Sequence, residues 1–464
     1  MTTLYCARWV LPVSSMAIAH GALAIDGAQI IAVGSRAELA TQFPQATVRD
    51  FGESAIIPGL INAHSHLELT AMRGFLENEE TDFFAWLKKL TLARIERMSA
   101  DDLNVSAAWG ACEAARAGVT CVADASDSAL ESMNALRDVG LRGIVFQESF
   151  GPDPRLAKEN FEKLKNKIAR LRDHETCLVK GGVSPHAPYT VCAPQLEMIA
   201  DFSVTESLPL MMHAAETTME VSLMREGRGT FAEGLRGRGI EWRAPGVSTI
   251  QYLDDHGVLQ AKPLLAHCIY VDEADLETLK QTDTRVAHCP KSNAKLGHGR
   301  APFAKMIEKG ITVGLGSDSV ASNNTCDLLE ESRFALLLAR GEASAHIVAT
   351  TEPGDDVAKE KIPLDAREIF QTATLGGSRA LGLQGQVGEL QAGLQADFAV
   401  VALGGPHQIP SYDPVSTLIF ASSGRDVSLT VVAGREIYSD GRITTVDEVR
   451  LQARMKEIAS KLRT

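Results

Sequence analysis

The chain has 464 residues, of which 45% are hydrophobic and 23% charged, and its formal net charge is −13. This composition is globular, and the acidic balance argues against nucleic acid or an anionic membrane surface as a partner, because both attract clustered cations. Aromatic residues make up only 5% of the chain, which also argues against a platform for stacking bases.

The N-terminal segment carries no targeting pattern. The run MTTLYCARWVLPVSS lacks a charged leader followed by a long apolar stretch, so we expect no signal peptide. No run of about 18 apolar residues predicts a membrane span. Eight cysteines are scattered without a CxxC pair, as is typical of reduced thiols. We therefore expect a cytoplasmic protein.

Short strands are predicted first, over 21–35 and 54–64, with glycine-centred turns between apolar runs. From about residue 100 helical segments, such as 104–118 and 194–207, alternate with short apolar runs. This alternation predicts a parallel sheet, and about eight repeats predict a closed (β/α)8 barrel. The apolar runs after the one that ends near residue 64 are 119–124, 141–147, 177–185, 208–216, 262–270, 285–292 and 311–318.

After about residue 385 the pattern returns to strands, over 385–403 and 427–443, and a mixed-charge helix is predicted over 446–464. We expect the two β-rich ends to pair. The predicted fold is α/β, a TIM-like barrel with a small β-sandwich domain built from both chain ends. The predicted parts are 1–57 and 385–464 for the sandwich and 58–384 for the barrel.

Histidines and an acid follow several predicted barrel strands. Active sites of such barrels lie at the C-terminal ends of the strands. Alternate residues of a strand point the same way, so His64 and His66 can both face the barrel mouth and bind one ion. His213 and Asp318, from other strand ends, would complete a nitrogen-and-oxygen ligand set that suits zinc or iron.

Each of these residues also has an ordinary structural explanation. A single HxH pair is weak evidence for a ligand, His213 alone is more often a satisfied core histidine, and Asp318 could cap a following helix. Their common position at strand ends favours the metal site. Six further histidines lie in turn-like or helical contexts, and we expect surface or structural roles for them: His20, His174, His256, His298, His346 and His407.

The ordered motifs PGLINAHSHLE, HAAE, AHC, AHCPKSNAKLG and GLGSDSVASNN resemble the amidohydrolase superfamily, in its chlorohydrolase and aminopurine deaminase branch. The resemblance covers nearly the whole chain, including GELQAGLQADFAVV near the C-terminus. It implies that His64, His66, His213 and Asp318 are metal ligands. The run GGVSPHAPY holds His186 where two-metal members carry a bridging lysine. The resemblance therefore implies one divalent ion, which we expect to be zinc, with iron(II) as the alternative.

The resemblance also implies catalytic roles. Glu216 matches the acid that shuttles protons, His267 matches the histidine that polarises the attacked centre, and Asp318 would accept a proton from the activated water. The implied reaction is hydrolytic deamination at an amidine-like ring carbon. Substrate contacts are implied for His186 and Ser322, and Trp86 in FFAWL would line the pocket.

Two departures bear on the substrate. Glu68 follows HSHL where deaminases of methylthioadenosine and adenosylhomocysteine typically have an apolar residue or proline, and Gln147 and Glu148 occupy the third strand where those enzymes carry arginine. The run HSHLELT resembles aminodeoxyfutalosine deaminases of menaquinone biosynthesis, so we predict 6-amino-6-deoxyfutalosine as substrate, with Glu68 and Gln147 contacting it. Alternatively, Glu68 orients a ligand histidine or is a first-turn helix acid.

Other functions stay open at this point. The first alternative is a methylthioadenosine/S-adenosylhomocysteine deaminase, followed by a triazine-type chlorohydrolase or a guanine deaminase. A non-enzyme alternative is an inactive relative that serves as a scaffold. For the partners we expect a small-molecule substrate and a second copy of the chain in a homodimer.

Overall fold

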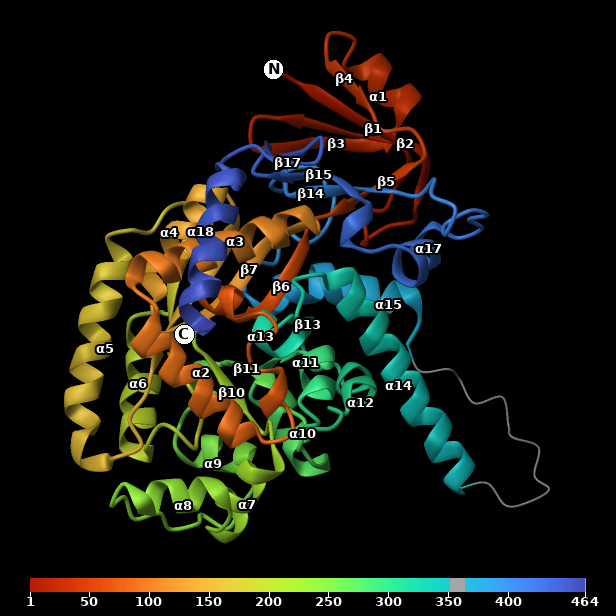
Figure 1. The fold of residues 1–464 in the computed structure, drawn as a ribbon. Coiled ribbons are helices and arrows are strands. Elements are labelled where there is room, and N and C mark those ends of the chain that lie inside the picture. Colours follow the sequence, from red (N-terminus) through yellow and green to blue (C-terminus); the bar gives the residue numbers. More distant parts are fainter. Residues whose placement is uncertain (351–363, 464) are drawn as a thin grey trace.

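Eight parallel strands form the centre of the structure, a computed structural model that describes residues 1–350 and 364–463 (Figure 1). They form two four-stranded sheets that single bridges join at Val183–Leu210 and at Ser65–Asp318, so the barrel closes. The predicted barrel is thus confirmed. Its strands are β6 (Leu60–Ser65), β7 (Val119–Ser126), β8 (Arg142–Ser149), β9 (Val179–Pro185), β10 (Met211–Ala214), β11 (Leu264–His267), β12 (Arg285–His288) and β13 (Val313–Leu315).

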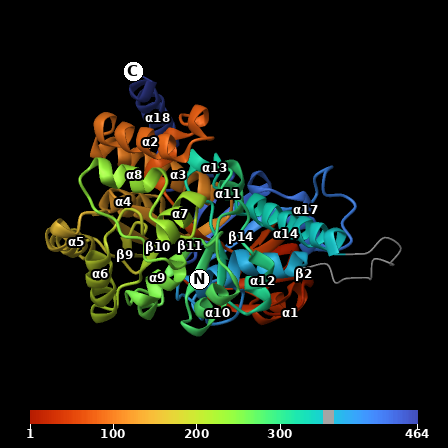
Figure 2. The same cartoon turned by 90° about the horizontal axis from the view of Figure 1, so that it is seen from below.

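Helices follow the strands and surround the barrel, as Figure 2 shows from below. They begin at side-chain caps such as Ser99, which with Asp102 forms a capping box at the start of α3. The helices on the barrel side are α2 (Phe83–Arg97), α3 (Ala100–Arg116), α4 (Ala129–Val139), α5 (Ala157–Arg172), α6 (Ala193–Thr205), α7 (Thr218–Glu226), α8 (Thr230–Gly237), α9 (Thr249–Asp255), α10 (Glu273–Gln281), α11 (Pro290–Lys295), α12 (Phe303–Glu308), α13 (Val320–Asn323), α14 (Leu328–Thr350), α15 (Ala366–Gln371) and α16 (Gly377–Ala380).

In the described residues, nine strands form a second sheet, and these strands come from both ends of the chain. Strands β5 and β14 lie antiparallel at its centre, with Ile56 opposite Val400, and join the two ends. The predicted division at 57/58 and 384/385 stays a prediction. The strands are β1 (Thr3–Val10), β2 (Ile18–Asp26), β3 (Gln29–Ser35), β4 (Thr47–Asp50), β5 (Ser54–Pro58), β14 (Phe398–Ala402), β15 (Val427–Val432), β16 (Arg435–Ser439) and β17 (Arg442–Ile443).

Side-chain contacts hold the second sheet and the C-terminal helix against the barrel. Arg142 of β8 donates two hydrogen bonds to Asp397, at 2.8 and 3.1 Å. Helix α18 (Glu448–Arg463) packs on α3, where the Lys461 Nζ lies 2.8 Å from an oxygen of Asp102.

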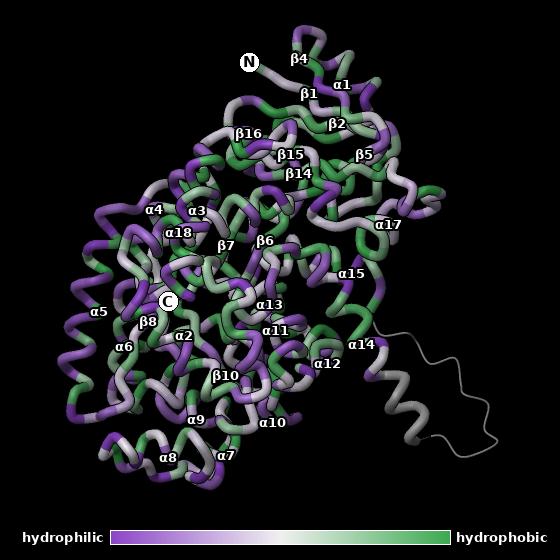
Figure 3. Tube along the Cα trace, in the orientation of Figure 1, coloured by the Kyte–Doolittle hydropathy of each residue, from purple (hydrophilic) through white to green (hydrophobic). Residues whose placement is uncertain are grey.

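Figure 3 shows the hydropathy of the elements: hydrophobic residues follow the strands of both sheets, whereas the outer helix α5 is largely hydrophilic. In the part of the chain that the structure describes, no helix combines the length and the apolar character that a membrane span requires.

Candidate metal centre

Three histidine nitrogens and one carboxylate oxygen converge at the C-terminal end of the barrel strands. The Nε2 atoms of His66 and His213 lie 3.2 Å apart. The Oδ1 atom of Asp318 lies 3.5 Å from the Nε2 of His64 and 3.6 Å from that of His66. These four side chains come from β6, from the loop that follows it, and from the ends of β10 and β13.

Backbone contacts on the side away from the cluster fix the histidine tautomers. His213 Nδ1 lies 2.9 Å from the carbonyl oxygen of His186, and His66 is hydrogen-bonded to the backbone of Ala125. Burial, followed by the neighbouring His64, lowers the pKa of His213 to about 4 and that of His66 well below its ordinary value, so both rings are neutral. Their Nε2 atoms therefore present lone pairs to each other.

This arrangement fits a metal ion. The Nε2 of His64 is buried and has no hydrogen-bond partner among the described residues. Neutral imidazoles and a carboxylate are donors that suit zinc or iron, and a cation would relieve the repulsion between the facing lone pairs.

The turn after β13 brings Asp318 to this point. Gly316 lies against His64, and a Cβ atom there would stand 2.9 Å from the His64 Cβ, so a larger residue would push the strands apart. The Oδ2 of Asp318 accepts hydrogen bonds from Ser292 at 2.5 Å and from Ser322 at 2.7 Å. Ser322, predicted to contact substrate, therefore directs its hydroxyl to Asp318.

Glu216 and His267 lie beside the metal cluster. The Nε2 of His267 is 3.7 Å from the Oε1 of Glu216, and its Nδ1 is 2.8 Å from the Oδ1 of Asn293. Tyr189 donates to the other oxygen of Glu216 at 3.3 Å. Burial alone would raise the pKa of Glu216, but His267 and His298 lower it below its ordinary value. The site thus holds Glu216 as an ionised carboxylate.

Glu148 and His186 lie on another side of the same cluster. Glu148, His186 and His213 each offer a ligand atom within 4.8 Å of the others. His213 is shared with the first group, and its Nε2 atom can bind only one ion. The Oε1 of Glu148 is buried and has no hydrogen-bond partner in the described part of the chain, whereas the Nδ1 of His186 lies 2.8 Å from the hydroxyl of Thr190. Sequence reasoning did not include Glu148 among the site residues.

Gln147, the neighbour of Glu148 on β8, points elsewhere. Its amide nitrogen lies within hydrogen-bonding distance of the carbonyl oxygens of Ser126, Asp127 and Glu148, the closest at 2.8 Å. The side chain thus supports the end of β7.

Glu68 is also hydrogen-bonded to neighbouring protein groups, mainly of the backbone. Its carboxylate accepts from the hydroxyl of Ser126 at 2.7 Å and from the backbone N–H groups of Asp127 at 3.3 Å and Ser128 at 3.0 Å. Arg94 lies 3.7 Å away. These contacts use both carboxylate oxygens at the start of α4, where an acid is favourable.

Trp86 belongs to an aromatic group on α2. Its ring stacks on Phe83 with centroids 5.8 Å apart, and Phe83 meets the ring of His298 edge-on at 4.5 Å. His298 lies 3.4 Å from Glu216, so this group borders the candidate site, and the Nε1 of Trp86 is buried without a hydrogen-bond partner among the described residues.

Of the surface and structural roles expected for the six further histidines, the surface role does not hold for His298. It is buried, with 6% exposure, whereas His20, His174, His256 and His407 are exposed or half-exposed. The side chain of His346 lies outside the described residues. The glycines on both sides of His298 predicted a turn, but nothing local signalled that the turn folds over Glu216.

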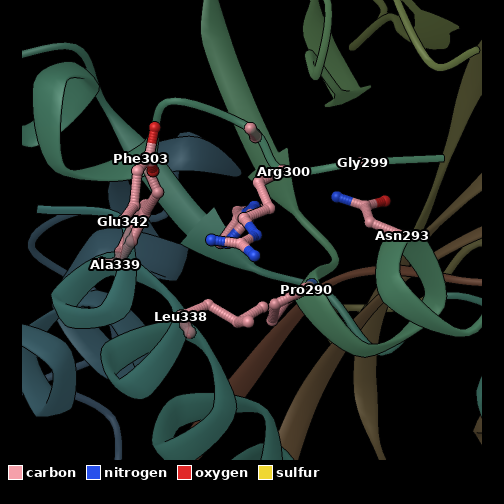
Figure 4. Close-up of a pocket in the computed structure, with 11 residues that line it drawn as sticks. Pro290, Asn293, Gly299, Arg300, Phe303, Leu338, Ala339 and Glu342 are labelled. Atoms are coloured by element: carbon pink, nitrogen blue, oxygen red, sulfur yellow. The ribbon is translucent and has the colours of Figure 1, made fainter. Parts of the chain in front are cut away.

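A narrow pocket lies beside the loop that carries His298 (Figure 4). Asn293 lies at one side of it, and Leu338, Ala339 and Glu342 of α14 lie at the other. Its volume is about 10 Å³, roughly the space of one water molecule, so it does not admit an organic substrate.

Comparison with known proteins identifies the family of the chain. The model of the amidohydrolase family matches residues 55–437, and that of a bacterial imidazolonepropionase-like composite domain matches residues 21–46. A 5-methylthioadenosine/S-adenosylhomocysteine deaminase from Syntrophobacter fumaroxidans is 32% identical over 447 residues, which cover 96% of this chain and 94% of the relative.

Solved structures show the same architecture. A zinc-bound adenosine deaminase from Xanthomonas campestris superposes with a TM-score of 0.84 at 25% identity, covering 99% of this chain and 98% of that one. A zinc-complexed atrazine chlorohydrolase from Arthrobacter aurescens TC1 gives 0.83 at 22% identity, over 98% of this chain and all of that one, which shows the shared fold.

Proposed function

The chain belongs to the amidohydrolase family, and on that premise we propose that it removes the 6-amino group of adenine nucleosides by hydrolysis. It is a hydrolase that acts on carbon–nitrogen bonds other than peptide bonds. The observation that carries the proposal is the convergence of His64, His66, His213 and Asp318 beside the Glu216–His267 pair.

The chemistry follows from these side chains. The four converging residues would hold a divalent ion, whose contribution is to make a water molecule acidic. Glu216, an ionised and buried carboxylate, takes up a proton and returns it to the ring nitrogen next to the attacked carbon. His267 has its Nδ1 directed at Asn293, which leaves its Nε2 to face the reacting centre. The water oxygen bonds to the attacked carbon, Asp318 takes the second proton of that water and passes it to the amino group, and the carbon–nitrogen bond then breaks to release ammonia.

Methylthioadenosine and adenosylhomocysteine are the first substrates that we propose. Relatives that match nearly the whole chain at 30 to 32% identity carry these substrates in their names. The second candidate is 6-amino-6-deoxyfutalosine, with a role in menaquinone biosynthesis, which the HSHLELT run favours. That candidate depends on Glu68, whose contacts to Ser126, Asp127 and Ser128 leave it little capacity for a ligand.

The deciding experiment measures product release by zinc-loaded protein: ammonia from the amino substrates and chloride from the triazine. The panel holds methylthioadenosine, adenosylhomocysteine, adenosine, 6-amino-6-deoxyfutalosine, guanine and a chlorinated triazine. We expect the highest kcat/KM for methylthioadenosine or adenosylhomocysteine. A preference for aminodeoxyfutalosine would restore the second candidate, and turnover of guanine or the triazine alone would overturn the proposal. A protein that binds zinc and releases neither product from any of them would support the inactive scaffold.

We propose zinc as the metal, because the donors are nitrogen and oxygen and the similar adenosine deaminase carries zinc. Iron(II) accepts the same donors, and metal analysis of the purified protein separates the two.

We also propose a cytoplasmic homodimer. The eight cysteines are free, and apolar side chains are exposed on α14 and on α17 (Pro414–Ala421), among them Leu337 and Phe420. Light scattering during gel filtration tests the oligomeric state.

A further inference from the structure

His298 is a buried histidine, and neither of its ring nitrogens has a hydrogen-bond partner within the described part of the chain. Such an arrangement is costly, because a buried polar atom without a partner loses the hydrogen bonds that water gave it. One group is within reach: the Nδ1 of His298 stands 3.4 Å from the Oε1 of Glu216. The ring therefore faces the carboxylate that the proposed reaction uses.

The loop around His298 holds the ring in place. Its backbone N–H donates to the carbonyl of Asn293 at 2.9 Å, and its own carbonyl accepts from the hydroxyl of Tyr270 at 2.6 Å. Phe83 closes one side of the ring. Asn293 also holds His267, so one residue sets the orientation of both histidines that approach Glu216.

Three side chains approach the two carboxylate oxygens of Glu216. Tyr189 approaches Oε2, while His267 and His298 approach Oε1 at 3.7 and 3.4 Å. His267 is already assigned to the reacting centre. His298 is the donor that remains for Oε1 when His267 turns to the substrate.

We propose that His298 is a positioning residue for Glu216, donating its Nδ1–H to Oε1 and aiming the carboxylate at the substrate's ring nitrogen. This inference rests on the proposed function, because it assigns His298 to the proton shuttle of that reaction. A ring that served only to fill space beside Phe83 would need no donor toward Glu216.

Two substitutions separate these roles. His298→Asn keeps an amide that can donate from the position of Nδ1, whereas His298→Leu keeps comparable bulk without a donor. We expect the leucine variant to lose about 10- to 100-fold in kcat with little change in KM, since a misplaced catalytic group costs about that much. We expect the asparagine variant to stay within about threefold of the wild type.

The pH profile adds a readout that packing alone would not move. A donor to an ionised carboxylate lowers its pKa, so its loss should shift the acid limb of kcat/KM to higher pH in the leucine variant. Titratable groups near Glu216 besides His298 include Tyr189, His267, His213 and His186, with Glu220 close behind it, and none of them is changed.

An NMR measurement tests the contact without any substrate. The ring nitrogen shifts of His298 should indicate the Nδ1–H tautomer and should change in Glu216→Gln. Equal losses in the asparagine and leucine variants at unchanged melting temperature, wild-type activity in both, or shifts insensitive to Glu216→Gln would each overturn the inference. Absence of deamination by the wild type would instead refute the proposed function, and the NMR result would still decide whether His298 contacts Glu216.

Discussion

The Nε2 atoms of His66 and His213 lie 3.2 Å apart, although neither carries a proton to share. The opposite nitrogen of His213 faces a backbone carbonyl, and His66 is likewise bonded to the backbone, while burial keeps both rings neutral. Two lone pairs held this close repel each other, and a cation between them would relieve that repulsion. The backbone contacts thus organise the site for a cation before any ion binds.

Metal content is the first consequence. We expect one zinc ion per chain and loss of the ion in His66→Ala, with His407→Ala, an exposed histidine, as the matched control. Removal of the ion by a chelator should lower the melting temperature by several degrees, because a ligand at about 1,000 times its Kd stabilises the fold by about 4 kcal/mol. Two ions per chain, with one lost in Glu148→Gln, would contradict this count and place a second ion beside Glu148 and His186.

Glu216→Gln should abolish most of the activity while the protein keeps its metal. Glutamine cannot accept and return a proton, and a general acid–base group contributes about 100- to 10,000-fold to the rate. Stopped assays of ammonia release, with metal analysis on the same sample, measure both effects. Glu233→Gln on the exposed face of α8 is the matched control. Full activity in Glu216→Gln would remove this residue from the mechanism.

Glu68→Gln should weaken the fold without reordering the substrates. The carboxylate accepts from one hydroxyl and two backbone N–H groups at the start of α4, and a glutamine can supply only one acceptor oxygen. Thermal unfolding and the substrate panel are measured on the same variant. A selective loss of aminodeoxyfutalosine turnover at unchanged stability would show that Glu68 contacts the ligand after all.

The residues at the strand ends could be predicted. Active sites of such barrels lie at the C-terminal ends of the strands, and the sequence shows the order of the apolar runs and the residues that follow them. This rule predicts that His64, His213 and Asp318 lie together, and in the structure they do. The partners of Glu68 could not be predicted, since Ser126 and Ser128 lie about 60 positions later in the chain and nothing local marks them. The contact of His298 with Glu216 could not be predicted either, because it depends on how a loop folds between two barrel strands.

Ser322→Ala should reduce metal affinity more than it changes substrate preference. Its hydroxyl donates to the Oδ2 of Asp318 at 2.7 Å, and such supporting hydrogen bonds to metal ligands are worth about 10- to 100-fold in affinity. Competition with a chelator measures the Kd for zinc. An unchanged Kd together with an altered KM would place the hydroxyl of Ser322 in the substrate pocket instead.

Glu220 should make the stability fall as the pH rises. Its carboxylate accepts from the backbone N–H groups of Ala215 and Glu216 and from the hydroxyl of Thr249, but burial raises its pKa to about 7 from an ordinary value of 4.5. Between these values the folded chain binds more protons than the unfolded chain, so the free energy of unfolding decreases with pH, by up to about 3 kcal/mol, and levels off above pH 7.

Glu220→Gln removes this titration, although it also loses acceptor capacity and should be less stable than the wild type at pH 5. Denaturation at constant zinc between pH 5 and 8 should therefore give a smaller decrease in the variant. Because every other buried acid is common to both proteins, the difference between the two curves isolates Glu220. Parallel curves would mean that Glu220 is ionised throughout this range, held by its three donors against the cost of burial.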